Sequence, residues 1–370
     1  MLSAKTTSTT TASPIPRPRA FFAEILRALA IFAVIILHNS ADYGEQYGQI
    51  PMSHWWAGTI WDGLVRFCVP MFVMLSGAFL LKSGKEVSIK EVFTKRLPKI
   101  VIPLIAWSII YVLYASYHTD KGISGMDVKE QLKTFLEGPV IYHFWFLYMM
   151  IGIYLLYPII NLFITSAKKV HIEYFLIVWF LTNCIFATIE ILFDLSIGID
   201  LSFFTGYVGY FILGYYLYTY TFTQKQLNSA YLLGVAGFLL SALFPYLCIL
   251  LNFENRGSLI ESDFTIDIVL VEIALFLWFK NRTYNEDSTG VLKKSISEIS
   301  KESFGIYLVH VLLMQALFEN DLTLFPKFAN MVGTWHPTWG IPLKALIILI
   351  LSYAVTKLIS QVPFIRKIVG

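Results

Sequence analysis

Two side chains in the first apolar segment have the spacing and the chemistry of a functional pair. Arg27 and His38 lie in FFAEILRALAIFAVIILHNS, residues 21–40, and are eleven residues apart. In a helix, this spacing places them on one face to within about 20°, with a difference in depth of about 16 Å. A neutral imidazole can act as a general base near neutral pH, and a guanidinium fork suits phosphate. Ionisable groups within a membrane usually face a protein interior or a water-filled cavity, so both residues are candidates for function.

A simpler interpretation of this segment stays open. Arg27 can extend toward the cytoplasmic headgroups and pair with Glu24, three residues earlier in the chain. His38 can lie at the outer boundary of the membrane without taking part in chemistry. The spacing alone favours neither interpretation.

A second pair, Ser303 and His310, lies in SFGIYLVH near the end of the chain. The two residues are seven positions apart and share a helix face to within about 20°. Ser303 can instead cap the N-terminus of its helix, a role that serine commonly has. For His310 we favour a position that lines a channel, because a histidine in contact with lipid would be costly.

The composition is that of a membrane protein. Of the 370 residues, 56% are hydrophobic and 14% are charged, and the mean hydropathy is +0.64, whereas soluble domains contain about 25% charged residues. The net charge of +3 is too small to indicate a nucleic-acid partner. The three cysteines do not have the spacing of a metal site. The chain is therefore predicted to be an all-α polytopic membrane protein.

Apolar runs divide the chain into about ten predicted transmembrane helices in one bundle, because a hydrocarbon core of about 30 Å needs about 20 apolar residues per helix. The predicted spans are residues 20–40, 57–81, 98–117, 142–163, 172–193, 203–222, 229–251, 264–280, 303–318 and 341–363. Three acidic residues fall within these runs. We expect Glu190 and Asp267 to lie at solvated outer ends, and Glu272 to face the bundle interior.

The distribution of Lys and Arg predicts the orientation. With a cytoplasmic N-terminus, the segments on the inside hold 19 Lys and Arg residues and those on the outside hold 5. Because cytoplasmic loops carry an excess of these residues, both termini are predicted to be cytoplasmic. Residues 1–19 are predicted to be a disordered cytoplasmic tail, residues 20–363 a transmembrane domain and residues 364–370 a short cytoplasmic tail. A cleaved signal peptide is less favoured, because Glu24 and Arg27 interrupt the apolar region.

Several motifs, in order along the chain, resemble those of one family. The first is Arg27 followed by ten residues and His38, R-ALAIFAVIIL-H. The others are VPMFVMLSGAFLL (69–81), TKRLPKIVIP (94–103), PVIYHFWFLYMMIGIYLLYPII (139–160) and SFGIYLVH (303–310). Together they resemble the acyltransferase family 3 membrane proteins over nearly the whole chain from residue 20. PVIYHFWF and SFGIYLVH look most like the enterobacterial common antigen O-acetyltransferase branch.

The resemblance implies a ten-helix bundle in the bacterial cytoplasmic membrane that takes acetyl-CoA from the cytoplasm. It would acetylate a hydroxyl of a cell-surface or lipid-linked glycan and would use no metal. His38 is then the expected general base, and Arg27 the expected catalytic and CoA-binding cation on the side from which CoA arrives. Lys95, Arg96 and Lys99 are expected to recruit the CoA phosphates, although their position also fits the general excess of cations on the inside.

Further residues are candidates for binding the acceptor. Arg66 can bind an acidic or phosphorylated part of the acceptor, or simply pair with Asp62 one helical turn earlier. His143 and Trp145 enter the fourth span from outside and can offer an aromatic face, although Trp at a membrane interface needs no function. The expected acceptor-binding residues are Arg66, His143, Trp145, Ser303 and His310.

Other functions remain open at this level. The same polar residues could form the path of an exporter of a glycan or lipid-linked sugar, without acyl chemistry. The donor could be a succinyl rather than an acetyl thioester. His38 could carry the acyl group transiently instead of acting as a base.

Overall fold

The computed structural model describes residues 20–81, 87–118, 127–193, 206–251, 262–284, 290–319 and 322–370. Within this part of the chain, 84% of residues are helical and none forms a strand, so the predicted all-α class is confirmed. The predicted disordered tail, residues 1–19, lies outside the described residues.

Several helical segments are long and apolar enough to cross a membrane. They coincide with seven of the ten predicted spans and show a multi-pass membrane protein. Among the described residues these segments are Phe21–Gln46, Met52–Leu80, Ile89–Tyr117, Tyr142–Ser166, Lys169–Glu190, Gln224–Leu250 and Pro337–Ser360.

The other three predicted spans correspond to helices of a different kind. α10 (Tyr207–Thr219) and α13 (Ile266–Lys280) have 13 and 15 residues, which gives lengths of about 20 Å against a hydrocarbon core of about 30 Å. α14 (Val291–Phe318) has 28 residues, but charged residues crowd its first half. That these three helices cross the membrane stays a prediction.

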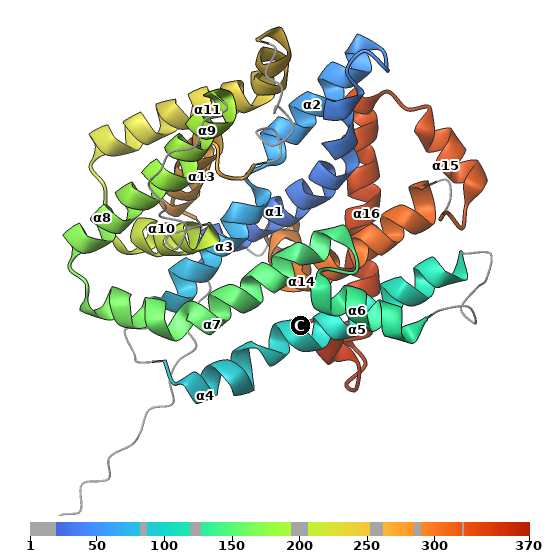
Figure 1. Cartoon of the computed structure of the whole chain (residues 1–370), viewed down its shortest axis with the longest axis horizontal. Helices are drawn as coiled ribbons and strands as arrows, with labels where there is room; N and C mark the ends of the chain where they lie inside the picture. The colour runs from blue at the N-terminus through green and yellow to red at the C-terminus, as the bar shows by residue number, and fades with distance from the viewer. Residues whose placement is uncertain are drawn as a thin grey trace, which may run out of the picture.

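α1 (Phe21–Ser40) is the central helix of the bundle. Its buried residues recur at helical spacing, so apolar side chains cover most of its surface and can pack on several neighbours at once. Figure 1 shows α1 passing through the middle of the molecule, and α14 and α13 both contact it. Its other main partners are α2 (Met52–Val65), α3 (Cys68–Leu80) and α16 (Pro337–Ser360).

Glycines hold α3 and α10 at backbone distance. A Cβ atom added to Gly77 in α3 would lie 1.7 Å from the carbonyl oxygen of Phe211, and one added to Gly214 in α10 would lie 1.9 Å from that of Met74. Small residues at such crossings let membrane helices approach closely. The short helix α10 is therefore fixed against a membrane-spanning helix.

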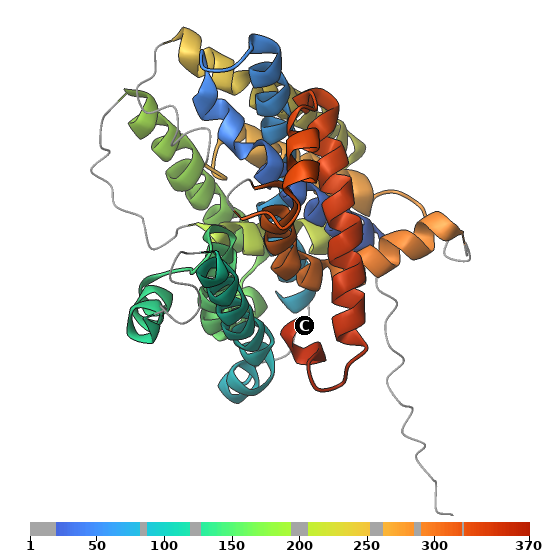
Figure 2. The same cartoon turned by 90° about the vertical axis from the view of Figure 1, so that its right-hand side faces the viewer.

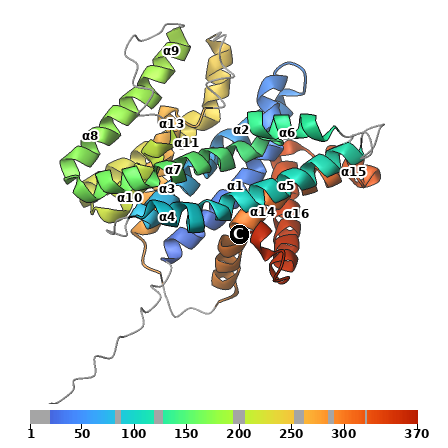
Figure 3. The ribbon, with the colours of Figure 1, turned by 60° about the horizontal axis from the view of Figure 1, so that its bottom comes forward.

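α5 (Pro98–Tyr117) and α7 (Trp145–Ser166) run side by side over one face of the bundle, as Figure 3 shows. The hydroxyl of Tyr157 in α7 donates to the carbonyl of Leu80, 3.0 Å away, and ties α7 to the end of α3. The remaining elements are η1 (Ala41–Gln46), α4 (Ile89–Glu91), η3 (Val92–Arg96), α6 (Val128–Glu137), η5 (Tyr142–Phe144), α8 (Lys169–Phe180), η6 (Leu181–Phe186), α9 (Ala187–Phe193), α11 (Gln224–Leu250), α15 (Pro326–Gly333) and η8 (Arg366–Ile368).

The C-terminal segment packs against the bundle. After α16 the chain folds back through η8 toward α5, as Figure 2 shows. The indole N–H of Trp107 donates to the carbonyl of Ile368 at 2.8 Å, and Val369 is buried. The end of the predicted tail at residues 364–370 therefore packs against α5.

The acidic residues within the apolar runs differ in their surroundings. Glu272 is fully buried and faces the bundle interior, as expected. Asp267 is only 4% exposed and accepts a hydrogen bond from the hydroxyl of Ser241. The expectation of a solvated boundary position was wrong for Asp267, because a neighbouring helix supplies its polar partner. Glu190 is half-buried.

Candidate active site

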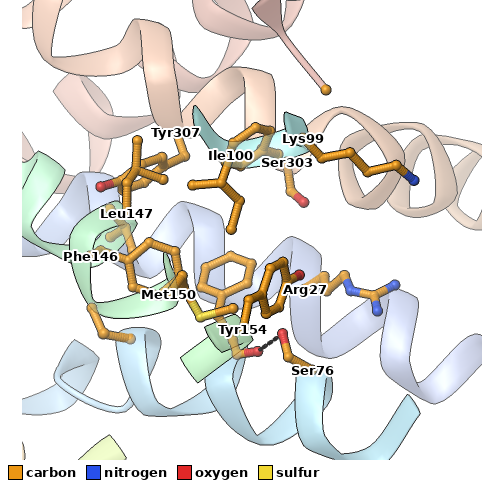
Figure 4. A pocket seen from close by; sticks show the side chains of 15 residues that line it. Arg27, Ser76, Lys99, Ile100, Phe146, Leu147, Met150, Tyr154, Ser303 and Tyr307 are labelled. Atoms are coloured by element: carbon orange, nitrogen blue, oxygen red, sulfur yellow. Dashed lines mark hydrogen bonds between the residues drawn. The ribbon is translucent and has the colours of Figure 1, made fainter. Parts of the chain in front are cut away.

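An inner cavity of about 280 Å³ lies between α1, α3, α5, α7 and α14. Arg27, Lys99 and Ser303 are among its polar residues, and apolar and aromatic side chains form most of its wall. Figure 4 shows the ends of Arg27 and Lys99 on one side, and Tyr307 and Phe146 on the other. The cavity therefore has a cationic end and an aromatic end.

The two cations reach this cavity from different helices. Arg27 projects from α1, with its guanidinium carbon 5.5 Å from the centre of the Phe79 ring. Lys99 comes from the first turn of α5 and is exposed. Their convergence places two of the residues expected to bind CoA in one cavity, and the described lining contains no acidic side chain.

Ser303 lies in the same cavity, on the side predicted for the donor rather than the acceptor. α14 begins at Val291, with Gly290 as its N-cap, so Ser303 lies in the interior of the helix. The interpretation of Ser303 as a helix cap was therefore wrong. The helix starts earlier than the apolar run because polar, helix-forming residues precede that run.

The other two predicted CoA-binding residues are absent from the described lining of the inner cavity. The Arg96 guanidinium lies 3.5 Å from the Glu91 carboxylate and 5.9 Å from the centre of the Tyr157 ring. Lys95 is exposed on η3. Both precede α5 directly in the chain, and Arg96 is half-buried there.

An outer cavity of about 240 Å³ unites four more of the predicted residues. His38 comes from α1, Arg66 from the C-cap of α2, His143 from η5 and Trp145 from the start of α7. His38 and Trp145 are more than 100 positions apart in the sequence, and the bundle brings them to one cavity. Its lining also includes Leu37, Tyr207, Asp263 and Tyr307.

Three histidines meet beside this cavity. The ring of His310 stacks on that of His38, with 5.3 Å between the ring centres, and lies 5.1 Å from the ring of His143. His310 is fully buried, and its Nδ1 lies 2.6 Å from the carbonyl oxygen of Tyr307. His38 and His143 line the cavity. His310 is absent from the described lining, and its ring packs against the rings of both. Among the described residues, no group of His, Cys, Asp or Glu has the geometry of a metal site.

Tyr307 is a site residue that sequence reasoning missed. It lines both cavities, and its hydroxyl donates to the carbonyl of His143. The residue stands inside the SFGIYLVH motif, one helical turn before His310. That spacing was a signal that Tyr307 and His310 share a helix face.

Tyr207 and Asp263 were also missed. The Tyr207 hydroxyl donates to the Asp263 carboxylate at 2.5 Å, and both residues line the outer cavity. Asp263 lies in the segment before α13. Burial raises the pKa of its carboxyl to about 6, while the hydrogen bond from Tyr207 and the charge of Arg66 lower that pKa. These two neighbours favour the ionised form of Asp263, whereas burial favours its neutral form.

The two cavities are adjacent. Val34, Val69, Phe146 and Tyr307 belong to the lining of both. Phe146 and Tyr307 thus lie between the part of the site that holds Arg27 and Lys99 and the part that holds His38 and Trp145. Such an arrangement suits the transfer of a small group between two substrates that arrive from different ends.

The fold and these cavities define a multi-pass membrane protein with an internal site between its helices. The family model described as an acyltransferase domain, of acyltransferase family 3, matches residues 21–357. The chain therefore belongs to this family and is a membrane acyltransferase. The comparisons with curated proteins and with solved structures found no match.

Proposed function

We propose that this protein is an O-acetyltransferase that moves an acetyl group from cytoplasmic acetyl-CoA to a hydroxyl of a cell-surface or lipid-linked glycan. The observation that supports it best is that a cavity lined by cations lies next to a cavity that holds His38. CoA is a polyanion, and the half-buried Arg27 and the exposed Lys99 offer it two positive charges at one cavity, with the stronger interaction expected at the less hydrated Arg27. The thioester would extend from there toward Tyr307.

The proposed transfer is a single displacement at the thioester carbonyl. The acceptor oxygen attacks the carbonyl carbon while His38 removes the hydroxyl proton. A C–O bond forms, the C–S bond breaks, and the CoA thiolate leaves and takes up the proton from the imidazolium. His143 and Trp145 lie on the acceptor side of this step, and Ser303 lies on the donor side. In this scheme His310 is a positioning residue that holds the ring of His38.

The resemblance to the enterobacterial common antigen branch makes cell-envelope glycans the first acceptors to test. Purified protein in vesicles would be incubated with acetyl-CoA labelled in the acetyl group, together with such glycans. We expect label in the glycan and release of one thiol for each acetyl group transferred. Binding or passage of glycan without thiol release would favour the exporter alternative.

Two finer points are tested in the same assay. Labelled succinyl-CoA would replace acetyl-CoA, and preferential transfer of succinyl would contradict the choice of donor. Acid-quenched protein would be digested and its peptides analysed by mass spectrometry. An acetyl group on His38 that forms without acceptor and disappears when acceptor is added would replace the general-base step with a covalent one.

A further inference from the structure

The charge of Arg66 is already balanced by its neighbour. Its Nε and one terminal nitrogen both lie 2.7 Å from the same carboxylate oxygen of Asp62. The side chains are 11% and 6% exposed, so water screens this pair little. A guanidinium in such a pair keeps its hydrogen-bonding capacity but offers little net attraction to an anion.

The carboxylate of Asp263 lies at the outer cavity. Asp263 lines it together with Arg66, and the Tyr207 hydroxyl holds one of its oxygens at 2.5 Å. The hydroxyl of Tyr210 fixes the backbone of Asp263 by a 2.5 Å hydrogen bond to its carbonyl oxygen. These two contacts from α10 give the carboxylate a defined position.

Among the residues that the structure describes, the charges around the outer cavity sum to a negative value. Asp62 and Asp263 outnumber Arg66, and His38 must be neutral in order to act as a base. Within the described lining, His143 and two tyrosines are the other titratable groups. An anion placed here would face a like charge in an enclosed space, where repulsion is strong.

On the basis of the proposed transfer to a glycan, we propose that the sugar unit bound in the outer cavity is uncharged. Asp263 accepts hydrogen bonds from its hydroxyl groups, and a unit that carries a carboxylate or a phosphate is excluded. This inference replaces the expectation that Arg66 binds an acidic part of the acceptor. The substrate class follows from the balance of charge around Arg66 and from the position of Asp263.

The lining offers what an uncharged sugar needs. An ionised carboxylate accepts strong hydrogen bonds from hydroxyl groups, and a sugar ring presents several of them. Trp145 is 38% exposed, and its ring lies 5.5 Å from that of Tyr207. The two rings give the apolar face of a sugar an aromatic surface next to the carboxylate.

The first test identifies the acetylated unit. Vesicles with the full-length protein would receive labelled acetyl-CoA and cell-envelope glycans, and the products would be cleaved to single sugar units and identified by mass spectrometry. Label on an uncharged unit is the expected result. Label on a uronic acid or a phosphorylated unit would overturn the inference and leave the proposed acetyltransferase intact. Label in no glycan would refute the proposed function itself, and this inference with it.

The second test changes the carboxylate. We expect Asp263→Asn to raise the KM for the uncharged acceptor about tenfold or more, because a charge-assisted hydrogen bond becomes a neutral one, while the KM for acetyl-CoA stays the same. Asp267→Asn is the matched control, since Asp267 is buried nearby but absent from the described lining. An unchanged acceptor KM in Asp263→Asn, with folding verified by its melting temperature, would overturn the assignment of Asp263. Equal increases in both variants would have the same consequence.

Discussion

The inner and outer cavities are similar in size and differ in the charged side chains of their described linings. Their volumes are about 280 and 240 Å³. The inner cavity has Arg27 and Lys99 with no acidic side chain in its described lining, whereas the outer cavity sets Arg66 against Asp62 and Asp263. Volume therefore does not distinguish a donor site from an acceptor site here. The difference lies in the charged side chains of the two described linings, because the inner one holds cations alone and the outer one also holds Asp263.

One helix connects the two cavities. α1 carries Arg27 at the inner cavity and His38 at the outer one, and Val34 between them lines both. The eleven-residue spacing thus corresponds to the distance along α1 between the proposed phosphate-binding cation and the proposed base. Each prediction below tests whether the two cavities have different tasks.

The largest expected effect is all-or-none and concerns which side of the membrane each cavity faces. In a cysteine-free background, single cysteines would be introduced at Glu45 and Asn330, two exposed positions on the predicted outer side. We expect a membrane-impermeant thiol reagent to label both from outside intact cells. A cysteine at Lys95 is the inner control and should react only after the cells are permeabilised. Labelling of the first two positions only from the cytoplasm would reverse the roles of the cavities.

The next effect concerns the proposed base. His38→Ala should lose roughly 10²- to 10⁴-fold in transfer, the usual contribution of a general base, while its affinity for CoA stays the same. Transfer by the parent protein should also fall as the pH decreases, because an imidazolium cannot accept the hydroxyl proton. Steady-state rates and calorimetric titration with CoA would measure the two properties separately.

His38→Gln is the control for hydrogen bonding. It keeps a polar side chain that cannot accept the proton, so it should stay as inactive as His38→Ala. Near-parental transfer by a folded His38→Gln sample would remove the base assignment. His143, which lines the same cavity, would then be the next candidate.

Sequence periodicity predicted the residues of this site that lie along one helix. Arg27 and His38 share a face of α1 because the helical repeat fixes their relation, and Arg66 pairs with Asp62 for the same reason. Tyr207 and Asp263 could not be predicted in this way. They meet 56 residues apart in the chain, and that contact depends on how α10 and the segment before α13 pack.

Hydropathy also limits how well the number of membrane spans can be predicted from the sequence. α7 combines buried residues with exposed apolar ones such as Leu155 and Ile159, whereas most apolar residues of α10 are buried or half-buried. Both helices come from apolar runs of the sequence, although their surroundings differ. Hydropathy alone cannot separate burial in lipid from burial in protein.

A smaller effect separates a cation inside the inner cavity from a cation at the surface. Arg27→Ala should weaken CoA binding roughly tenfold, while Arg96→Ala should change it less than about twofold, because a partly desolvated cation interacts more strongly with phosphate than a screened one. Calorimetric titration of both variants with CoA decides between them. Parental affinity in Arg27→Ala would make Arg27 a structural residue, and equal losses in the two variants would remove the distinction between cavity and surface.

The smallest effect concerns His310, which stacks on His38 without lining the outer cavity in the described part of the chain. An aromatic pair contributes about 1 kcal/mol beyond the area that it buries, which corresponds to about fivefold in a rate that depends on the orientation of His38. We therefore expect His310→Ala to lower kcat by about this factor and to leave the KM for acetyl-CoA unchanged. His310→Phe keeps a ring in the stack and should recover most of the kcat. If His310 moved protons itself, His310→Phe would be as slow as His310→Ala, because a phenyl ring can support its neighbour but cannot exchange a proton with it.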